Sequence, residues 1–159
     1  MPEPSGDVAP VTARAALDLS APVLLLTAVP YQDEDGIANK VIEECTELGT
    51  QLSESTAKYM SERGMSPLRQ PSVDLKSARQ ALNIKIMSAV SAGNAFIGHR
   101  KSVSVRAELY KDGVLVAKTG KTRDSAGGAF GGFKSSCSVL ERTVNTLGND
   151  IAKWLVGLR

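Results

Sequence analysis

The glycine-rich run at residues 125–135 is the part of the sequence that most suggests chemistry, because it lies between a predicted strand and a predicted helix. Phosphate-binding loops occur in that context and hold phosphates with backbone N–H groups and a lysine. Here Phe133 separates Gly132 from Lys134, so the spacing of that motif fails by one residue. We therefore expect no nucleotide cofactor. The run is interpreted either as a flexible connection anchored by Phe130 and Phe133, or as a partner-contact loop formed by Phe130, Phe133 and Lys134.

Residues for nucleophilic or metal chemistry are few. His99 is the only histidine, and no serine lies in the G-x-S-x-G or S-x-x-K patterns that mark an activated nucleophile. Cys45 and Cys137 are separated by most of the chain, which is not the spacing of a structural zinc site. We therefore predict no catalytic residue, no metal site and no cofactor, and thus that the chain is not an enzyme. A small hydrolase that uses His99 and a nearby serine is kept as an alternative.

Two long helices are predicted from apolar residues that recur at three- and four-residue steps, over residues 37–63 and 136–156. Gly64 follows the first and can adopt the left-handed conformation that ends a helix. An apolar run at residues 22–29 predicts a buried strand. Residues 1–21, rich in proline and without periodicity, are expected to form a flexible N-terminal tail ahead of a single domain at residues 22–157.

Three further strands are expected, because apolar and polar residues alternate over residues 82–90, 102–110 and 114–122. For the turn between the last two, a three-residue loop with Gly113 in a bulge keeps the apolar side chains on one face and opposes Leu115 to Leu109. The predicted fold class is α/β (α+β): one mixed, largely antiparallel sheet with two long helices packed on it.

The charge distribution singles out the second half of the chain, although the net charge is only +2. Acidic residues outnumber basic ones up to residue 62, and basic residues outnumber acidic ones over residues 99–134. The candidates for facing an anionic partner are Arg100, Lys101, Arg106 and Lys118. Alternatively, the two halves of opposite sign attract each other within the fold. Aromatic residues make up 4% of the chain, and few lie among the basic ones, so no nucleic-acid partner is expected. No apolar run reaches the ~18 residues of a membrane span.

Four segments carry a family resemblance: Val29-Pro30-Tyr31, Arg63-Gly64, the hairpin at residues 105–113, and residues 147–155. The chain resembles uncharacterised bacterial cell-envelope proteins, often lipoproteins, with the α/β fold of the TolB N-terminal domain and the curli secretion protein CsgG. The resemblance implies a non-enzymatic binding or assembly module, periplasmic or associated with the outer membrane, that contacts an envelope protein partner. It also implies a lipid anchor, for which this chain shows neither a lipidation cysteine nor an export signal. A cytoplasmic regulatory domain that binds an anionic ligand on the basic hairpin is the alternative.

Cys45 and Cys137 lie on or beside the apolar stripes of the two predicted helices. If the helices lie side by side, the two sulfurs could meet. From the residues alone, a disulfide and a pair of buried free thiols both remain open. The envelope resemblance favours the bond, since disulfides persist in oxidising compartments and are rare in the cytosol. We therefore predict a Cys45–Cys137 disulfide.

Overall fold

The computed structural model describes residues 16–32, 45–94, 98–126 and 136–159, and for residues 90–94, 98–101, 125, 126 and 136 it describes the backbone alone. Five strands form one sheet: β1 (Val23–Leu26), β2 (Pro67–Gln70), β3 (Gln80–Asn94), β4 (Gly98–Lys111) and β5 (Val114–Ala126). Their order across the sheet is β2-β1-β3-β4-β5. β1 is parallel to both of its neighbours, whereas β3, β4 and β5 are antiparallel. The predicted mixed, largely antiparallel sheet is confirmed.

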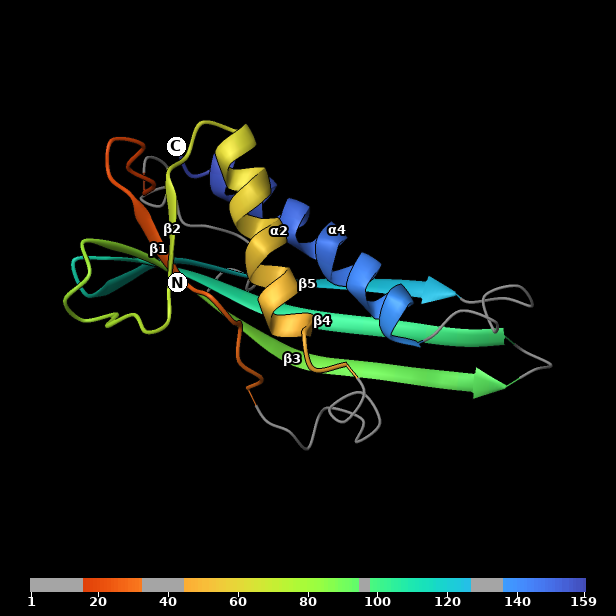
Figure 1. Ribbon diagram of the computed structural model, residues 1–159. Coiled ribbons are helices and arrows are strands. Elements are labelled where there is room, and N and C mark those ends of the chain that lie inside the picture. Colours follow the sequence, from red (N-terminus) through yellow and green to blue (C-terminus); the bar gives the residue numbers. More distant parts are fainter. Residues whose placement is uncertain (1–15, 33–44, 95–97, 127–135) are drawn as a thin grey trace, which may run out of the picture.

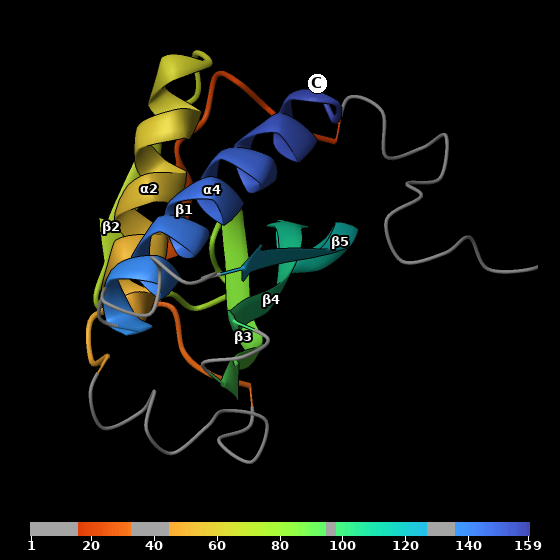
Figure 2. The ribbon, with the colours of Figure 1, turned by 90° about the vertical axis from the view of Figure 1, so that its right-hand side faces the viewer.

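Two helices, α2 (Leu48–Glu62) and α4 (Ser136–Val156), lie side by side on one face of this sheet (Figures 1 and 2). Leu52 of α2 and Leu147 of α4 are fully buried against the inward side chains of the strands. Such burial is what an amphipathic stripe contributes to a helix–sheet layer. Within the described ranges, no helix combines the length and the apolar character needed to cross a membrane. The predicted packing of two long helices on one sheet is confirmed.

The first helix is shorter than predicted, although α4 has the predicted bounds. Residues 45–47 form a turn, and α2 begins at Leu48; the rest of the predicted start, residues 37–44, lies outside the described residues. Cys45 and Leu48 are both buried, so the apolar spacing continues through a turn that is not helical. At the other end the prediction is confirmed, since Gly64 follows α2 with φ +84°.

The β4–β5 turn differs from the predicted three-residue loop. Asp112 and Gly113 alone form it, with φ values of 50° and 82°, as in the two-residue hairpin turns that asparagine, aspartate and glycine favour. Lys111 pairs with Val114, and a bulge then shifts the register so that Leu109 opposes Ala117 rather than Leu115. The bulge places Ala117 and Thr119 on the helix-covered face, as the predicted loop also would, whereas Leu115 pairs with Tyr110 and is exposed.

Residues 16–21 pack against the domain, although the sequence assigns them to a tail. Leu17 is buried, and its backbone N–H donates to the carbonyl of Leu158 at 3.0 Å. The side chain of Gln80 accepts a hydrogen bond from the Asp18 N–H at 2.8 Å and donates to the Asp18 carbonyl at 2.9 Å. These contacts fix residues 16–21 beside the start of β3. The sequence of the segment has no periodicity that would have predicted this packing.

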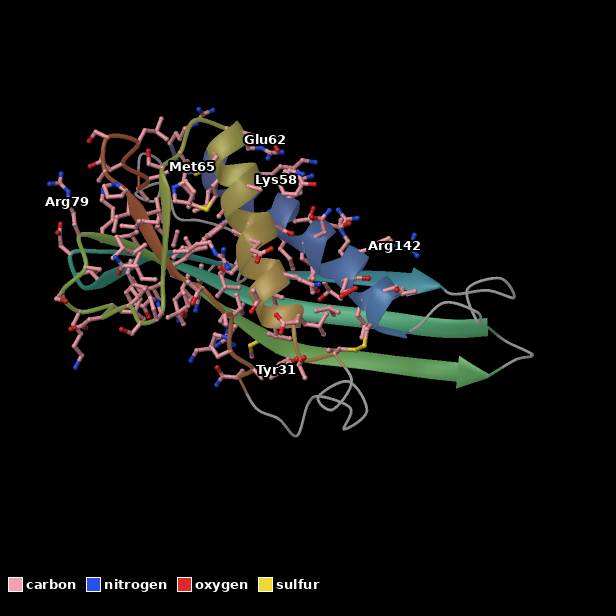
Figure 3. The ribbon with its side chains drawn as sticks, in the orientation of Figure 1. Tyr31, Lys58, Glu62, Met65, Arg79 and Arg142 are labelled. Carbon is pink, nitrogen blue, oxygen red and sulfur yellow. A yellow bond between two sulfur atoms is a disulfide. The ribbon has the colours of Figure 1, made fainter. Side chains whose placement is uncertain are left out.

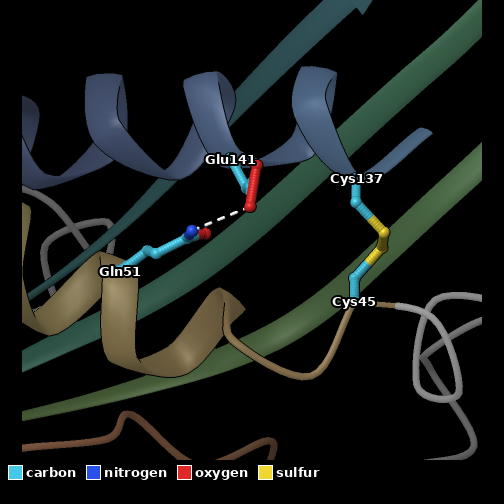
Figure 4. The surroundings of a disulfide bond; sticks show 4 residues. All are labelled: Cys45, Gln51, Cys137 and Glu141. Carbon is cyan, nitrogen blue, oxygen red and sulfur yellow. Dashed lines mark hydrogen bonds between the residues drawn. A yellow bond between two sulfur atoms is a disulfide. The ribbon is translucent and has the colours of Figure 1, made fainter. Parts of the chain in front are cut away.

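The predicted disulfide is confirmed: Cys45 and Cys137 are bonded, with their Cα atoms 5.3 Å apart (Figure 4). It joins the turn before α2 to the first turn of α4. The bond closes a loop across a sequence separation of 92 residues. On the chain-entropy model, a loop of that length stabilises the fold by about 4–5 kcal/mol at most.

Candidate functional site

The sequence-predicted candidates fall into described and undescribed parts of the chain. Arg106 and Lys118 are exposed on β4 and β5. The backbone of Arg100 and Lys101 belongs to β4, but their side chains lie outside the described residues, as does the side chain of His99. The partner-contact candidates Phe130, Phe133 and Lys134 also lie outside the described residues.

Arg106 and Lys118 lie on the sheet face opposite the helices, which we call the outer face. Their strand neighbours, such as Ala107 and Thr119, are buried on the helix side, and successive side chains of a strand point to opposite faces. In the register, Lys85 of β3 faces Arg106, which in turn faces Gly120 of β5. In the next row, Asn83, Glu108 and Lys118 stand side by side. The strands thus bring Lys85 into the same cluster, and we call Lys85, Arg106 and Lys118 the basic triad.

The triad is short of opposite charge. Directly facing side chains on one sheet face have Cβ atoms about 4.5–5.5 Å apart, and like charges in that position repel each other. Within the described residues, none of the three takes part in an ion pair or a side-chain hydrogen bond. Glu108 is the nearby carboxylate, and it accepts a hydrogen bond from Asn83 at 2.9 Å. Because Glu108 faces Lys118 in the register, this part of the outer face carries three cations and one carboxylate, an excess of two positive charges among the described residues.

A hollow of about 330 Å³ lies in this cluster, lined by Arg106, Glu108, Lys118, Thr119 and Gly120. Its floor is the backbone of β5, because Gly120 has no side chain to cover it. Hydroxyls flank the hollow on one side, where Ser104 and Thr122 share a hydrogen bond of 2.8 Å. The site combines guanidinium and ammonium groups with hydroxyls around an open backbone, which suits the binding of an anionic group.

Not every basic residue of this region is free. Arg123, farther along β5, points to the helix side and forms two hydrogen bonds of 2.8 Å with the carboxylate of Asp150 on α4. The charge of Arg123 is thus neutralised within the fold, by a carboxylate that lies outside the acidic residues 1–62. The contrast with Arg106 and Lys118 follows from strand alternation, because an odd-numbered and an even-numbered residue of one strand face different layers.

A second hollow, an open groove of about 780 Å³, runs between the outer sides of α2 and α4 and is lined by Gln51, Glu54, Ser55, Lys58, Ser138, Glu141, Arg142 and Asn145. Lys58 and Arg142 project from the helices away from the sheet (Figure 3). Gln51 donates a hydrogen bond to Glu141 at 2.8 Å (Figure 4), and Ser55 donates one to Asn145 at 2.8 Å. The groove holds charges of both signs, and its deeper polar groups bond with each other. These residues therefore serve mainly to hold α2 and α4 together.

The sequence indicated two members of the basic triad and missed the third. Lys85 was expected on the polar side of the strand at residues 82–90, which is where it lies. Its place beside Arg106 depends on which strands are neighbours and in which register, and alternation within one strand does not carry that information. Tyr110 stands at the end of the same face, where burial and, to a smaller extent, Glu108 raise the pKa of its phenol above 10.0. The phenol is therefore a neutral hydrogen-bonding group at physiological pH.

No protein-family model matches the sequence, and no curated protein matches it either. Solved structures do resemble the fold. One is the PelC dodecamer from Paraburkholderia phytofirmans, at 14% sequence identity and a TM-score of 0.56, covering 84% of this chain and 86% of that one. Another is the lipoprotein GNA1162 from Neisseria meningitidis, at 14% identity and a TM-score of 0.51, covering 84% and 99%.

Protein XCC0632 from Xanthomonas campestris, described by the family model DUF330, is similar at 15% identity and a TM-score of 0.51, covering 69% of this chain and 63% of that one. Identities this low show a shared fold and leave function open. The fold is therefore one that occurs in bacterial lipoproteins, in line with the resemblance found in the sequence. The narrower likeness to the TolB N-terminal domain and CsgG stays a prediction.

Proposed function

We propose that this chain is a non-enzymatic binding or assembly module of the cell envelope that acts through protein–protein contacts. The observation that carries the proposal is the asymmetry of the sheet. One face is closed by α2 and α4, whereas the other carries the basic triad, which forms no ion pair with any residue that the structure describes. Surface charges that the fold does not use itself are available to orient and hold a partner.

Two observations support the envelope as the location. The Cys45–Cys137 disulfide is of the kind that persists in oxidising compartments. In addition, a solved bacterial lipoprotein shares the fold. Neither the outer face nor the groove between the helices brings together a nucleophile, a base and an orienting acid among the described residues, so the proposal assigns no catalytic role to them.

One alternative has a specific observation in its favour. A regulatory domain that binds a small anionic ligand would also use Arg106 and Lys118, which line the hollow over Gly120. It differs from the proposal in its occupant and in its location, since a cytosolic domain gains nothing from a persistent disulfide.

Photo-crosslinking in cells that produce the full chain tests the proposal. A photoreactive amino acid replaces Thr122 on the outer face or, as a matched control, Thr146 on the exposed side of α4. We expect a crosslinked product of defined mass in the envelope fraction from position 122 and none from position 146. Absence of a defined protein product from position 122 would contradict the proposal.

A further inference from the structure

The three positive charges of the basic triad repel one another, which destabilises the sheet. Lys85 and Arg106 face each other across β3 and β4, and Lys118 lies one row away on β5. Like charges in facing positions destabilise a sheet, whereas an acidic residue at any one of the three positions would have relieved the repulsion. Glu108 faces Lys118 and offsets one of the three charges, whereas Asp124 lies two outward positions beyond Gly120, about 13 Å along the strand, and is too distant to offset the others. A bound anion would offset the repulsion.

Gly120 leaves room that the packing of the chain does not require. A Cβ atom built at this position would meet only the Val105 carbonyl oxygen, at an ordinary 3.8 Å, and the residue does not have a positive φ. The fold would therefore accept a larger residue here, and glycine inside a strand is normally unfavourable. What glycine does provide is the open floor of the hollow beside Arg106 and Lys118.

Building on the proposed function, we propose that this hollow docks an acidic, extended segment of the partner protein, with a carboxylate held between Arg106 and Lys118 and a second carboxylate near Lys85. Arginine forms paired hydrogen bonds with carboxylates, and lysine adds a mobile point charge. Lys85 and Lys118 are separated by two strand spacings, about 9.6 Å, and by one row of side chains, about 6.7 Å. The resulting separation of about 12 Å is close to that between residues i and i+4 of an extended chain. The exposed backbone over Gly120 lets that chain approach closely.

The lining favours a polypeptide over a membrane surface. Asn83, Ser104 and Thr122 flank the triad with hydrogen-bonding groups that match the polar backbone of a peptide. A membrane-binding surface would instead combine its cations with apolar side chains that enter the lipid, and the rows of the triad contain none.

Binding of a short synthetic peptide that alternates Glu and Ser to the purified full chain tests the proposal, with a Gln-Ser peptide and phosphatidylglycerol vesicles as comparison probes. The variant Lys85→Gln with Arg106→Gln and Lys118→Gln removes the triad. Its matched control, Lys58→Gln with Arg142→Gln and Lys153→Gln, removes the same charge from exposed positions on the helices. Gly120→Val fills the hollow and leaves all charges in place. Thermal unfolding checks that each variant folds.

We expect the Glu-Ser peptide to bind more tightly than the other probes and to bind less tightly as salt rises. The triad variant and Gly120→Val should each weaken binding about tenfold or more, and the helix control should change it less than about threefold. Equal losses in the triad variant and the helix control, unchanged binding in Gly120→Val, or preference for the vesicles would each overturn the docking site. If the peptide fails to bind while position 122 still crosslinks to a partner, the docking chemistry is wrong and the proposed function stands. If position 122 also gives no crosslink, both fail.

Discussion

Gln80 is the first residue of β3 and is fully buried. Its side-chain amide forms hydrogen bonds with the backbone of the segment that precedes β1, as a neighbouring strand would. It accepts a hydrogen bond from the Asp18 N–H and donates to the carbonyls of Asp18 and Ala21, at 2.8, 2.9 and 3.3 Å. A buried polar side chain is tolerated when its hydrogen bonds are made, and these three fix the path of residues 18–21. Nothing in the sequence identified this role, because a glutamine at the edge of an apolar pattern usually lies in solvent.

Replacing Gln80 should therefore destabilise the protein. Gln80→Leu keeps much of the side-chain volume but removes the side-chain partners of the Asp18 N–H and of the buried Ala21 carbonyl, so we expect a loss of about 2–4 kcal/mol in the free energy of unfolding. Urea unfolding gives the value. Gln70→Leu is the matched control, since Gln70 is half-buried at the sheet edge with no side-chain hydrogen bond among the described residues, and it should change stability by less than about 0.5 kcal/mol. Equal losses in the two variants would contradict the role assigned to Gln80.

The lowered pKa of Asp18 predicts that the stability of the protein depends on pH. Hydrogen bonds from the hydroxyl and the backbone N–H of Ser20, and then the contact with Arg79, hold the pKa of its carboxyl below 3.8. A lowered pKa in the fold means that the carboxylate stabilises the protein above pH 3.8 and that this contribution is lost as the pH falls through the lowered value. Asp18→Asn should thus lower Tm near neutral pH, and the difference from the native chain should shrink in acid. Asp124→Asn, at an exposed position, is the control; a difference for Asp18→Asn that grows in acid would refute the assignment.

Among the elements, the two helices are joined by contacts that need close approach. A Cβ atom on Gly148 of α4 would come within 2.6 Å of the Ser55 Cβ and 2.8 Å of the Thr56 nitrogen of α2. Arg63 at the end of α2 then donates to Asn149 at 2.6 Å. The apolar stripes that pack on the sheet were visible in the sequence, but this seam was not, because its glycine and polar residues carry no periodic signal of their own.

Gly148→Ala is expected to destabilise the protein by about 1–3 kcal/mol, because the new methyl group meets α2 backbone that cannot move independently of the core. Chemical unfolding measures the effect. Thr146→Ala on the exposed side of the same helix serves as the control. Among the described residues its hydroxyl bonds to the Arg142 carbonyl within α4, and a change below about 0.5 kcal/mol is expected. If Gly148→Ala were neutral or stabilising, the close approach of the helices would be disproved.

Element boundaries show where sequence patterns reach their limit. The bounds of α4 were predicted fully, because its stripe is unbroken and Gly157 follows it. The predicted start of α2 failed at Cys45, since a turn can bury residues at helical spacing when a tertiary contact holds it. The prediction of the β4–β5 turn was wrong for a similar reason. A bulge near Val116, which no sequence pattern indicates, sets Ala117 opposite Leu109 although the turn has two residues. Each miss is a place where tertiary contacts outweighed local pattern.

At the scale of the whole molecule, the disulfide links the turn before α2 to the first turn of α4. Its removal in the pair Cys45→Ser and Cys137→Ser should lower the free energy of unfolding by up to about 4–5 kcal/mol, because the unfolded chain regains the entropy of a long open loop. Urea unfolding with and without reductant measures this. Reductant should lower the midpoint of the native chain and leave that of the double variant unchanged. A native midpoint that does not respond to complete reduction would contradict a stabilising bond.

The candidate site belongs to this scale too. The sequence placed Arg106 and Lys118 on exposed strand positions, but their assembly with Lys85 around Gly120 depends on the order of three strands. The sequence also offered Arg123 as a member of the same basic region, and the fold pairs it with Asp150 instead. The distribution of charged residues along the sequence therefore predicted a basic surface. Which cations form that surface depends on the register of the strands.

The state of the two cysteines in cells tests the envelope assignment most directly. The chain is taken from cells that produce it at its natural level, its thiols are trapped at once with an alkylating reagent, and the intact mass is measured before and after reduction. We predict no alkyl group on Cys45 or Cys137 without reductant, two after reduction, and recovery of the protein in the envelope fraction. Two alkyl groups on the unreduced protein, with the chain recovered from the cytoplasm, would contradict the account.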